Sequence, residues 1–217
     1  QGKLHLLLRG PDGISNSAAA QHSESIETIF MHTPGIKVII PSTPYDIKGL
    51  IKTALREDDP VICFEHKMLY KTKGPVPEKE YLIPFGVADI KKEGNDVTIV
   101  TMSRMVHESL KAAEELEHEG ISVEVIDLRT LVPWDKKTVI ESVKKTNHLV
   151  VAHETWKRAG WGAEIASVVQ EEAFDYLDAP IIRVGAKNVP MPFSSSLQNF
   201  VTPDYKDVIN AVKKVLR

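Results

Sequence analysis

The stretch of sequence best suited to chemistry is a loop of small residues that ends at a histidine. From Arg9 to Glu27 the chain reads RGPDGISNSAAAQHSESIE, and its glycines, proline and serines disfavour regular structure. His22 ends this loop. Imidazole changes protonation state near neutral pH, so a histidine presented by a loop can serve as a general acid or base. The alternative is a histidine that only hydrogen-bonds loop carbonyls.

The elements on either side of this loop explain why it would be a site. The apolar run from Leu4 to Leu8 predicts a buried strand before it. An apolar helical pattern follows it, with Ser23 as the expected N-cap. Ligands of α/β proteins bind at the carboxyl ends of parallel strands. The pattern therefore presents His22 to the ligand-binding crevice of an α/β domain.

A second candidate site is the acidic turn Glu57-Asp58-Asp59. Three carboxylates at the expected end of a helix oppose the helix dipole, which is unfavourable unless a cation compensates them. Carbonyls of the last helical turn and the Asp59 carboxylate offer the oxygen ligands that hard cations prefer. A solvated acidic turn before Pro60 is the alternative, and the residues leave both open.

Four further motifs suggest contacts rather than catalysis. Gly160-Trp161-Gly162 precedes an expected helix, where it could bind an anion or form a tight turn. His153-Glu154 ends an expected strand, where it could contact a ligand or form a solvated strand end or a subunit contact. Arg129 follows a buried strand and is expected to bridge to carboxylates across a domain or subunit boundary. The proline-rich segment Val189–Phe193 predicts a rigid apolar strip that packs against another domain or chain.

Composition excludes several classes of protein. With 217 residues, 42% of them hydrophobic, the chain can bury a core, and its formal charge of -3 gives no electrostatic reason to bind nucleic acid or membrane. Cys63 is the only cysteine and lies in an apolar run, which indicates inert core and a reducing compartment such as the cytoplasm. The sequence contains no P-loop, paired metal-binding histidines or nucleophile elbow.

The order of the expected elements predicts two α/β domains. Residues 1–80 follow a strand, helix, strand, helix, strand pattern typical of a parallel sheet, with Thr43 as the N-cap of the second helix. The irregular residues 66–84 are expected to link the domains, and residues 85–217 again alternate strands and helices after a turn at residues 91–95. Gln1 is not an initiator and the first strand begins almost at once. The sequence is therefore expected to begin inside a domain.

These motifs together resemble a known family. The residues that match are Arg9–Gly13 with His22-Ser23, Pro41–Asp46 with Lys48-Gly49-Leu50, Asp127–Leu131, Lys145-Thr146-Asn147 and Val189–Pro192. They occur in the order found in the β subunits of the thiamin-diphosphate-dependent 2-oxo acid dehydrogenases. The similarity runs through essentially the whole chain but lacks the N-terminal third of such a subunit.

The resemblance implies a fold, a cofactor and partners. Residues 1–80 would be the C-terminal part of a transketolase-like pyrimidine-binding domain, with a linker to residue 84, and residues 85–217 a transketolase C-terminal-type domain. The cofactor would be thiamin diphosphate with Mg²⁺. It would be shared with the α subunit and incomplete here, because the family's glutamate for the aminopyrimidine lies upstream. The expected partners are the α subunit and a second β subunit in an α₂β₂ heterotetramer, and the lipoyl acyltransferase of the complex.

The resemblance also implies roles for both candidate sites. His22 would line the channel where the lipoyl group arrives for reductive acylation. Ala54, Glu57 and Asp59 match a turn where the family often holds a monovalent cation such as K⁺. Residues 65–78 are most similar to acetoin and branched-chain relatives, so acetoin, pyruvate and branched-chain 2-oxo acids stay open as substrates. The alternatives are a transketolase or deoxyxylulose-phosphate-synthase relative, and a non-catalytic assembly module.

Overall fold

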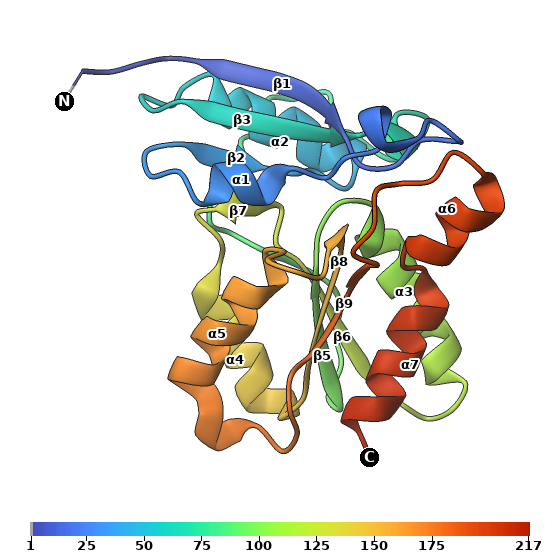
Figure 1. Ribbon diagram of the computed structural model, residues 1–217. Helices are drawn as coiled ribbons and strands as arrows, with labels where there is room; N and C mark the ends of the chain where they lie inside the picture. Colours follow the sequence, from blue (N-terminus) through green and yellow to red (C-terminus); the bar gives the residue numbers. More distant parts are fainter. Residues whose placement is uncertain (1) are drawn as a thin grey trace.

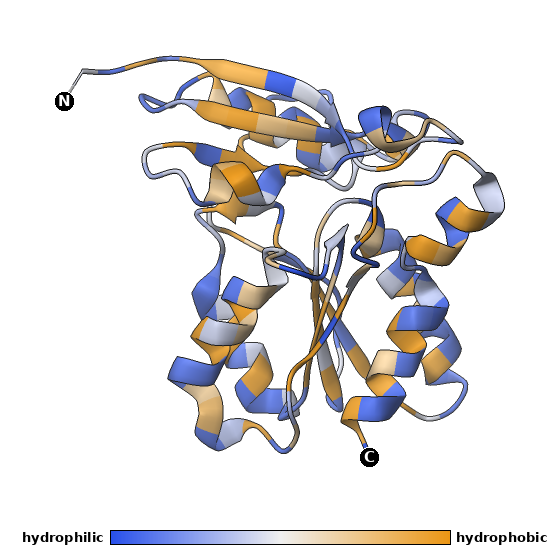
Figure 2. Cartoon of the chain, in the orientation of Figure 1, coloured by the Kyte–Doolittle hydropathy of each residue, from blue (hydrophilic) through white to orange (hydrophobic). Residues whose placement is uncertain are grey.

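Two α/β layers stack against each other in the protein (Figure 1). The computed structural model describes residues 2–217 and contains a four-stranded and a five-stranded sheet within them. The smaller sheet lies across the end of the larger one where strand β8 finishes. Apolar residues follow the strands of both sheets and the helix faces turned toward them (Figure 2). None of the helices in the described residues is long and apolar enough to cross a membrane.

The first sheet has the strand order β1-β3-β2-β7. Its parallel strands are β1 (Leu7–Asp12), β2 (Lys37–Ile39) and β3 (Val61–His66). Helix α2 (Pro44–Ala54) packs on one face, where Leu50 contacts the core around Cys63. Its start is fixed as the sequence predicts, because the Thr43 hydroxyl accepts the N–H of Asp46 at 3.1 Å. The short helix α1 (Glu27–Met31) contributes Phe30, which packs on Phe64 of β3 with the ring centroids 5.6 Å apart.

The second sheet has the strand order β4-β6-β5-β8-β9, with β4 antiparallel and the others parallel. Its strands are β4 (Asp89–Lys92), β5 (Val97–Thr101), β6 (Val123–Asp127), β8 (Leu149–Trp156) and β9 (Ile182–Ala186). Helices cover both faces, α3 and α7 on one side and α4 and α5 on the other (Figure 1). These helices are α3 (Arg104–Glu117), α4 (Lys136–Thr146), α5 (Gly162–Ala173) and α7 (Tyr205–Val215), and the short α6 (Ser195–Val201) precedes the last. Every residue of β5 and β6 is therefore buried.

One strand crosses from the second domain into the first sheet. Strand β7 (Thr130–Val132) pairs antiparallel with β2 and forms the edge of the smaller sheet. Just before it, the carbonyl of Arg129 accepts the N–H of Ile40 at 2.9 Å. The two domains therefore share a continuous hydrogen-bonded sheet, which fixes their relative position.

A cluster of charges surrounds this crossing. Arg129 Nε lies 2.8 Å from Asp46 of α2, in an ion pair whose N–H is not aligned for a hydrogen bond, and its Nη2 donates to Asp89 at 2.6 Å. Lys91 also donates to Asp89, at 2.6 Å, and lies 3.6 Å from Asp127. Asp46 and Asp127 are fully buried, and burial raises the pKa of Asp127 to about 6 although the charge of Lys91 opposes this. The expected bridge by Arg129 across a domain boundary is confirmed.

Three local expectations are wrong. Ser23 does not cap α1, which begins at Glu27 after Ile26, because the loop before it stays non-helical to that point. The expected turn at residues 91–95 contains the end of β4, since β4 pairs with β6 and forms no hairpin with β5. The expected strand at Leu4–Leu8 is not buried, since β1 begins at Leu7, and Leu6 and Leu8 are 39% and 49% exposed. The expected linker runs from β3 to β4 and packs on the first domain, where Tyr81 stacks on Tyr45 with the ring centroids 4.5 Å apart.

Removal of Arg129 tests the interdomain charge cluster. We expect Arg129→Ala to destabilise the chain by about 3 kcal/mol or more, since Asp46 and Asp127 stay buried with only Lys91 to compensate them. Urea unfolding measures this loss. The control is Lys136→Ala, which removes an exposed ion pair with Glu172 and should cost about 1 kcal/mol or less. Equal losses in the two variants would contradict the assignment.

Candidate active-site loop

The segment that carries His22 is a closed loop between β1 and α1. The N–H of Gly13 donates to the carbonyl of Glu24 at 2.8 Å, which brings the two ends of the loop together. His22 ends a short 3₁₀ helix, Ala20–His22, and is exposed to solvent. His22 therefore lies on the exposed surface of the loop that follows β1, and its presentation to a ligand-binding crevice stays a prediction.

The second domain holds this loop through three hydrogen bonds. Glu154 of β8 accepts the N–H of Ile14 at 2.7 Å. The hydroxyl of Thr155, the next residue, donates to the carbonyl of Ser25 at 3.0 Å. Near the tip of the loop, the amide oxygen of Gln198 in α6 accepts the N–H of Ser17 at 3.2 Å.

Apolar contact supplements these bonds. The side chain of Ile14 is buried in a small cluster with Met191 and Val201 of the second domain. Part of the expected proline-rich strip thus packs against another domain of the same chain. Its two ends remain outside this contact, with Val189 44% and Phe193 70% exposed.

Glu154 is the charged centre of the floor beneath the loop. Its carboxylate is buried and also accepts hydrogen bonds from His66 Nε2 at 2.9 Å and from Arg104 Nε. Because His66 Nδ1 accepts the N–H of Met68 at 3.1 Å, its Nε2 carries the hydrogen that it donates to Glu154. Burial alone would raise the pKa of Glu154, but the bond from His66 and the charge of Arg104 lower it to about 2.

Two more buried carboxyl groups lie beside this centre. Asp12 ends β1 and accepts the N–H of Ile26 at 3.4 Å, while Glu27 begins α1. Burial raises the pKa of Asp12 to about 6, partly offset by His66. Burial and the nearby charge of Asp12 raise the pKa of Glu27 well above its usual value. Glu27 is therefore the carboxyl group at the base of the loop that holds a proton most strongly.

The glycine-rich turn Gly160-Trp161-Gly162 accommodates a buried histidine. His153 is 1% exposed and donates from Nδ1 to the carbonyl of Thr155 at 3.0 Å. A Cβ atom would lie 2.8 Å from the His153 ring at Gly160 and 2.7 Å from it at Gly162. The ring of Trp161 packs on it with the centroids 5.0 Å apart. This packing explains the glycines as a tight turn around His153, without an anion.

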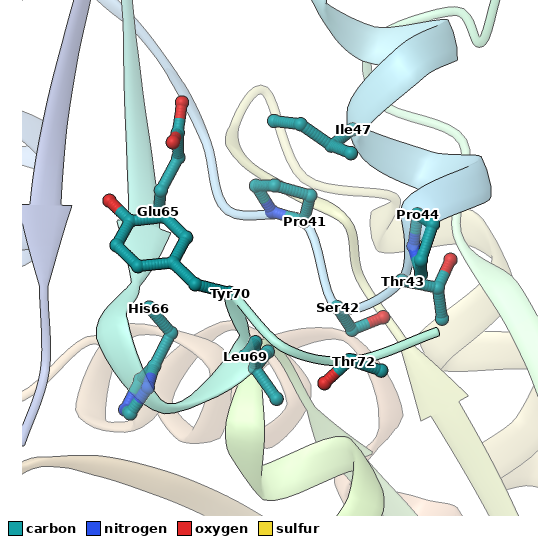
Figure 3. A pocket seen from close by; sticks show the side chains of 10 residues that line it. All are labelled: Pro41, Ser42, Thr43, Pro44, Ile47, Glu65, His66, Leu69, Tyr70 and Thr72. Atoms are coloured by element: carbon teal, nitrogen blue, oxygen red, sulfur yellow. The ribbon is translucent and has the colours of Figure 1, made fainter. Parts of the chain in front are cut away.

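A pocket of about 230 Å³ opens at the carboxyl ends of β2 and β3 (Figure 3). Glu65 and Tyr70 form one wall, and residues 41–44 with Ile47 form the other. Two of its polar side chains are already paired: Arg9 pairs with Glu65 at 2.5 Å, and Ser42 donates to Asp46 at 3.2 Å. His22 is not among the lining residues. The pocket is therefore a mostly apolar hollow beside the loop and assigns no catalytic group.

At the predicted cation site, a lysine lies against the carboxylates. Ala54 ends α2, and its carbonyl accepts the N–H of Glu57 at 3.3 Å. The ammonium of Lys37 donates to Glu57 and lies 3.5 Å from Asp59. Among residues 2–217, no three His, Cys, Asp or Glu side chains are placed to hold a metal ion. Since Lys37 already compensates this acidic turn, the residues fit an ammonium group better than K⁺, and the cation site stays a prediction.

Comparison with known proteins identifies the family. The model of the transketolase C-terminal domain matches residues 86–208, and that of the transketolase pyrimidine binding domain matches residues 2–73. The chain belongs to the transketolase family. Its fold class of a pyrimidine-binding domain part followed by a C-terminal-type α/β domain is thereby confirmed.

Individual relatives show which members of this family the chain is similar to. The chain is 51% identical over 215 residues to the pyruvate dehydrogenase E1 component subunit beta of Rickettsia felis, spanning 99% of this chain and 66% of that protein. It is 43% identical to the 2-oxoisovalerate dehydrogenase subunit beta of Bacillus subtilis, over 92% of this chain and 62% of that one. A solved split gene transketolase, described as an inactive beta4 tetramer, superposes with a TM-score of 0.82 at 27% identity, over 99% of this chain and 67% of that one.

The buried His153 makes stability depend on pH in a defined window. Burial, with smaller effects of Arg183 and Lys157, lowers its pKa from 6.5 to about 4. The folded chain then binds fewer protons than the unfolded chain between these values, so stability present above pH 6.5 is lost as the pH falls toward 4. The loss should reach about 3 kcal/mol.

Comparison of His153→Gln with the native chain isolates this effect. The raised pKa values of Asp12 and Asp127 increase stability as the pH falls, but they do so in both proteins and cancel in the comparison. Urea unfolding between pH 7 and 4 should show a shallower loss in the variant. An exposed control, His118→Gln at the end of α3, should keep the native pH profile. A parallel profile for His153→Gln would show that His153 is not held neutral.

Proposed function

We propose that the chain belongs to the β subunit of a thiamin-diphosphate-dependent 2-oxo acid dehydrogenase and that pyruvate is the substrate of the assembled enzyme. The observation that carries this is 51% identity to a pyruvate dehydrogenase β subunit over 99% of the chain. Of two relatives from Bacillus subtilis, the pyruvate dehydrogenase subunit beta is 46% identical and the 2-oxoisovalerate dehydrogenase subunit beta 43%, which favours pyruvate over a branched-chain 2-oxo acid. The two domain models are shared with transketolase, but the solved split gene transketolase is only 27% identical, which favours a dehydrogenase subunit over a transketolase.

The domain division follows the same proposal. Residues 1–80 would form part of the pyrimidine-binding domain and residues 85–217 the C-terminal domain. The family models, which end at residue 73 and begin at residue 86, support this division, as does the separation into two sheets. The crossing strand β7 is the exception, since it belongs to the second domain in sequence and to the first in pairing.

His22 has a specific role in this proposal. Reductive acylation opens the disulfide of the lipoyl group: one sulfur takes the acyl group and the other leaves as a thiolate that must be protonated. An exposed imidazole on this loop can reach an arriving lipoyl group and donate that proton. The loop that carries His22 is hydrogen-bonded to Glu154 and Thr155 of β8, which hold it in a defined position.

The cofactor site requires other residues. Residues 2–217 place no cluster of acidic or histidine side chains for Mg²⁺, so they do not fit the diphosphate end of the cofactor. We assign that end to the α subunit, and the glutamate for the aminopyrimidine to residues outside these 217.

The expected partners are the α subunit, a second β subunit and the lipoyl acyltransferase. Exposed apolar side chains near the second domain's surface support association, above all Phe193 at 70%, Phe200 at 66% and Leu197 at 54%. Together they form a surface on and before α6. An α₂β₂ heterotetramer is the proposed assembly.

The cofactor assignment predicts that the 217-residue chain alone does not bind thiamin diphosphate. Titration calorimetry with Mg²⁺ present should show no saturable heat, because neither the aminopyrimidine glutamate nor the diphosphate site is supplied. The full-length β subunit mixed with α is the positive control. Stoichiometric binding by the isolated chain would overturn this division of the cofactor site.

A His22→Ala substitution in the full-length β subunit, assembled with α, tests both the function and the role of the histidine. Oxidation of pyruvate with an artificial electron acceptor should persist, since it needs no lipoyl group. Transfer to the acyltransferase should fall by about 10²–10⁴-fold, the usual cost of removing a positioned acid–base group. His32→Ala, an exposed histidine just after α1, is the matched control and should retain both activities.

Two results would contradict these assignments. Absence of pyruvate oxidation in the assembled native enzyme, with oxidation of another substrate, would overturn the proposed substrate. A parallel fall of both assays in His22→Ala, together with a lower melting temperature, would show that His22 only braces the loop.

A further inference from the structure

The hydrogen bonds between the His22 loop and the second domain differ in strength. The contacts from Thr155 and Gln198 join neutral groups at 3.0 Å and 3.2 Å. The contact from Ile14 to Glu154 ends on a buried carboxylate and is shorter, at 2.7 Å. Hydrogen bonds to an ionised acceptor are roughly twice as strong as neutral ones. Glu154 therefore provides the strongest attachment of the loop to the second domain.

The backbone turn that begins the loop is shaped around Glu154. Gly13 has a φ of +73°, and a Cβ atom there would lie 2.2 Å from His66 Nε2 and 2.9 Å from Glu154 Oε1. The turn thus approaches the His66–Glu154 pair more closely than any side-chain-bearing residue allows. Both carboxylate oxygens are occupied, one by Ile14 and His66 and the other by Arg104.

We propose that Glu154 is the positioning residue for the His22 loop. Its carboxylate lies on β8 of the second domain and sets the conformation of residues 13–24 of the first domain. The loop therefore adopts this conformation only when the two domains are packed together. The value of this positioning for catalysis rests on the proposed role of His22. The positioning itself is a property of the chain and can be measured without any reaction.

A different role for Glu154 makes a distinguishable prediction. If it only clamped the domains through His66, its loss would loosen the whole interface, including the bond from Ile40 to the carbonyl of Arg129 beside β7. If it positions the loop, the effect should be confined to the loop, because β7 and the Arg129 ion pairs hold the domains together independently.

Amide hydrogen exchange in Glu154→Gln and Glu154→Asp measures this difference. In Glu154→Gln, the side-chain NH₂ group must face Arg104 or face Ile14 and His66, all of which are donors. In Glu154→Asp, the side chain is one methylene too short to reach all three donors. The Ile14 and Gly13 amides should exchange roughly ten- to a hundredfold faster, the range expected for losing a buried hydrogen bond to a charged acceptor. The Ile40 amide and those of β5 should change by less than about twofold.

Two control variants test whether the effect is specific to Glu154. Thr155→Val removes the neutral bond from the next residue of the same strand and should accelerate the loop amides by only a few-fold, about the range of a neutral hydrogen bond. Glu108→Gln removes the other carboxylate bound to Arg104 and leaves the loop untouched. If Glu154→Gln does not fold, Glu154→Asp, which keeps the charge beside Arg104, carries the test.

Unchanged exchange of the Ile14 amide would overturn the proposal, and so would an equal acceleration at Ile40, which would make Glu154 a domain clamp. Assays of the same variants in the full-length β subunit with α separate it from the proposed function. Faster loop exchange with undiminished transfer to the acyltransferase would leave Glu154 as the positioning residue and remove His22 from the reaction.

Discussion

The burial of charge between the two domains is the constraint on which the rest of the structure depends. Asp46 in the first domain and Asp127 in the second are both fully buried, and their charges are compensated by Arg129 and Lys91 at the same boundary. Unpaired buried carboxylates would cost several kcal/mol each, so this arrangement tolerates little displacement of one domain relative to the other. Strand β7 adds backbone pairing with β2 at the same boundary. Together they define one relative placement of the two sheets.

The ordered conformation of the His22 loop depends on this placement of the two domains. Within its own domain it is closed by the bond between Gly13 and Glu24, tied to Asp12 and packed against His66. Its hydrogen bonds to the second domain come from β8 and α6, and Ile14 packs on Met191 and Val201. A loop of this length costs conformational entropy to order, which local contacts alone compensate poorly. Residues of the second domain that are remote in sequence therefore decide whether the histidine is held in a defined position.

The parts of the fold that sequence patterns could predict are those determined by local interactions. The Thr43 cap, the strands of the second sheet and the bridge by Arg129 follow from caps, apolar periodicity and a cation placed just after a buried strand. Strand β7 was missed because its three residues become a strand only by pairing with β2, which is remote in sequence. Helix α6 was missed because its first turn is a run of serines that reads as loop.

The same distinction applies to the candidate site. The composition of the loop and the position of His22 were readable from the sequence. The partnership of Glu154 with Ile14 was not, since the two residues are 140 positions apart. Gly13 and a glutamate expected at a strand end were usable signals, but only the fold brings them together, and Glu154 lies within β8. Ser23 illustrates the opposite error, where a good local cap signal lost to the closure of the loop by Glu24.

Three acidic residues share the floor of the loop, and their different surroundings assign them different charges. Glu154 faces Arg104 and receives hydrogen bonds on both oxygens, so its pKa falls to about 2 and it stays ionised. Burial raises the pKa of Asp12 to about 6, partly offset by His66. Burial and the charge of Asp12 raise the pKa of Glu27 well above its usual value. A proton on Glu27 reduces the repulsion among three neighbouring buried carboxyl groups in a region of low dielectric. Glu154 keeps its charge and accepts the Ile14 N–H.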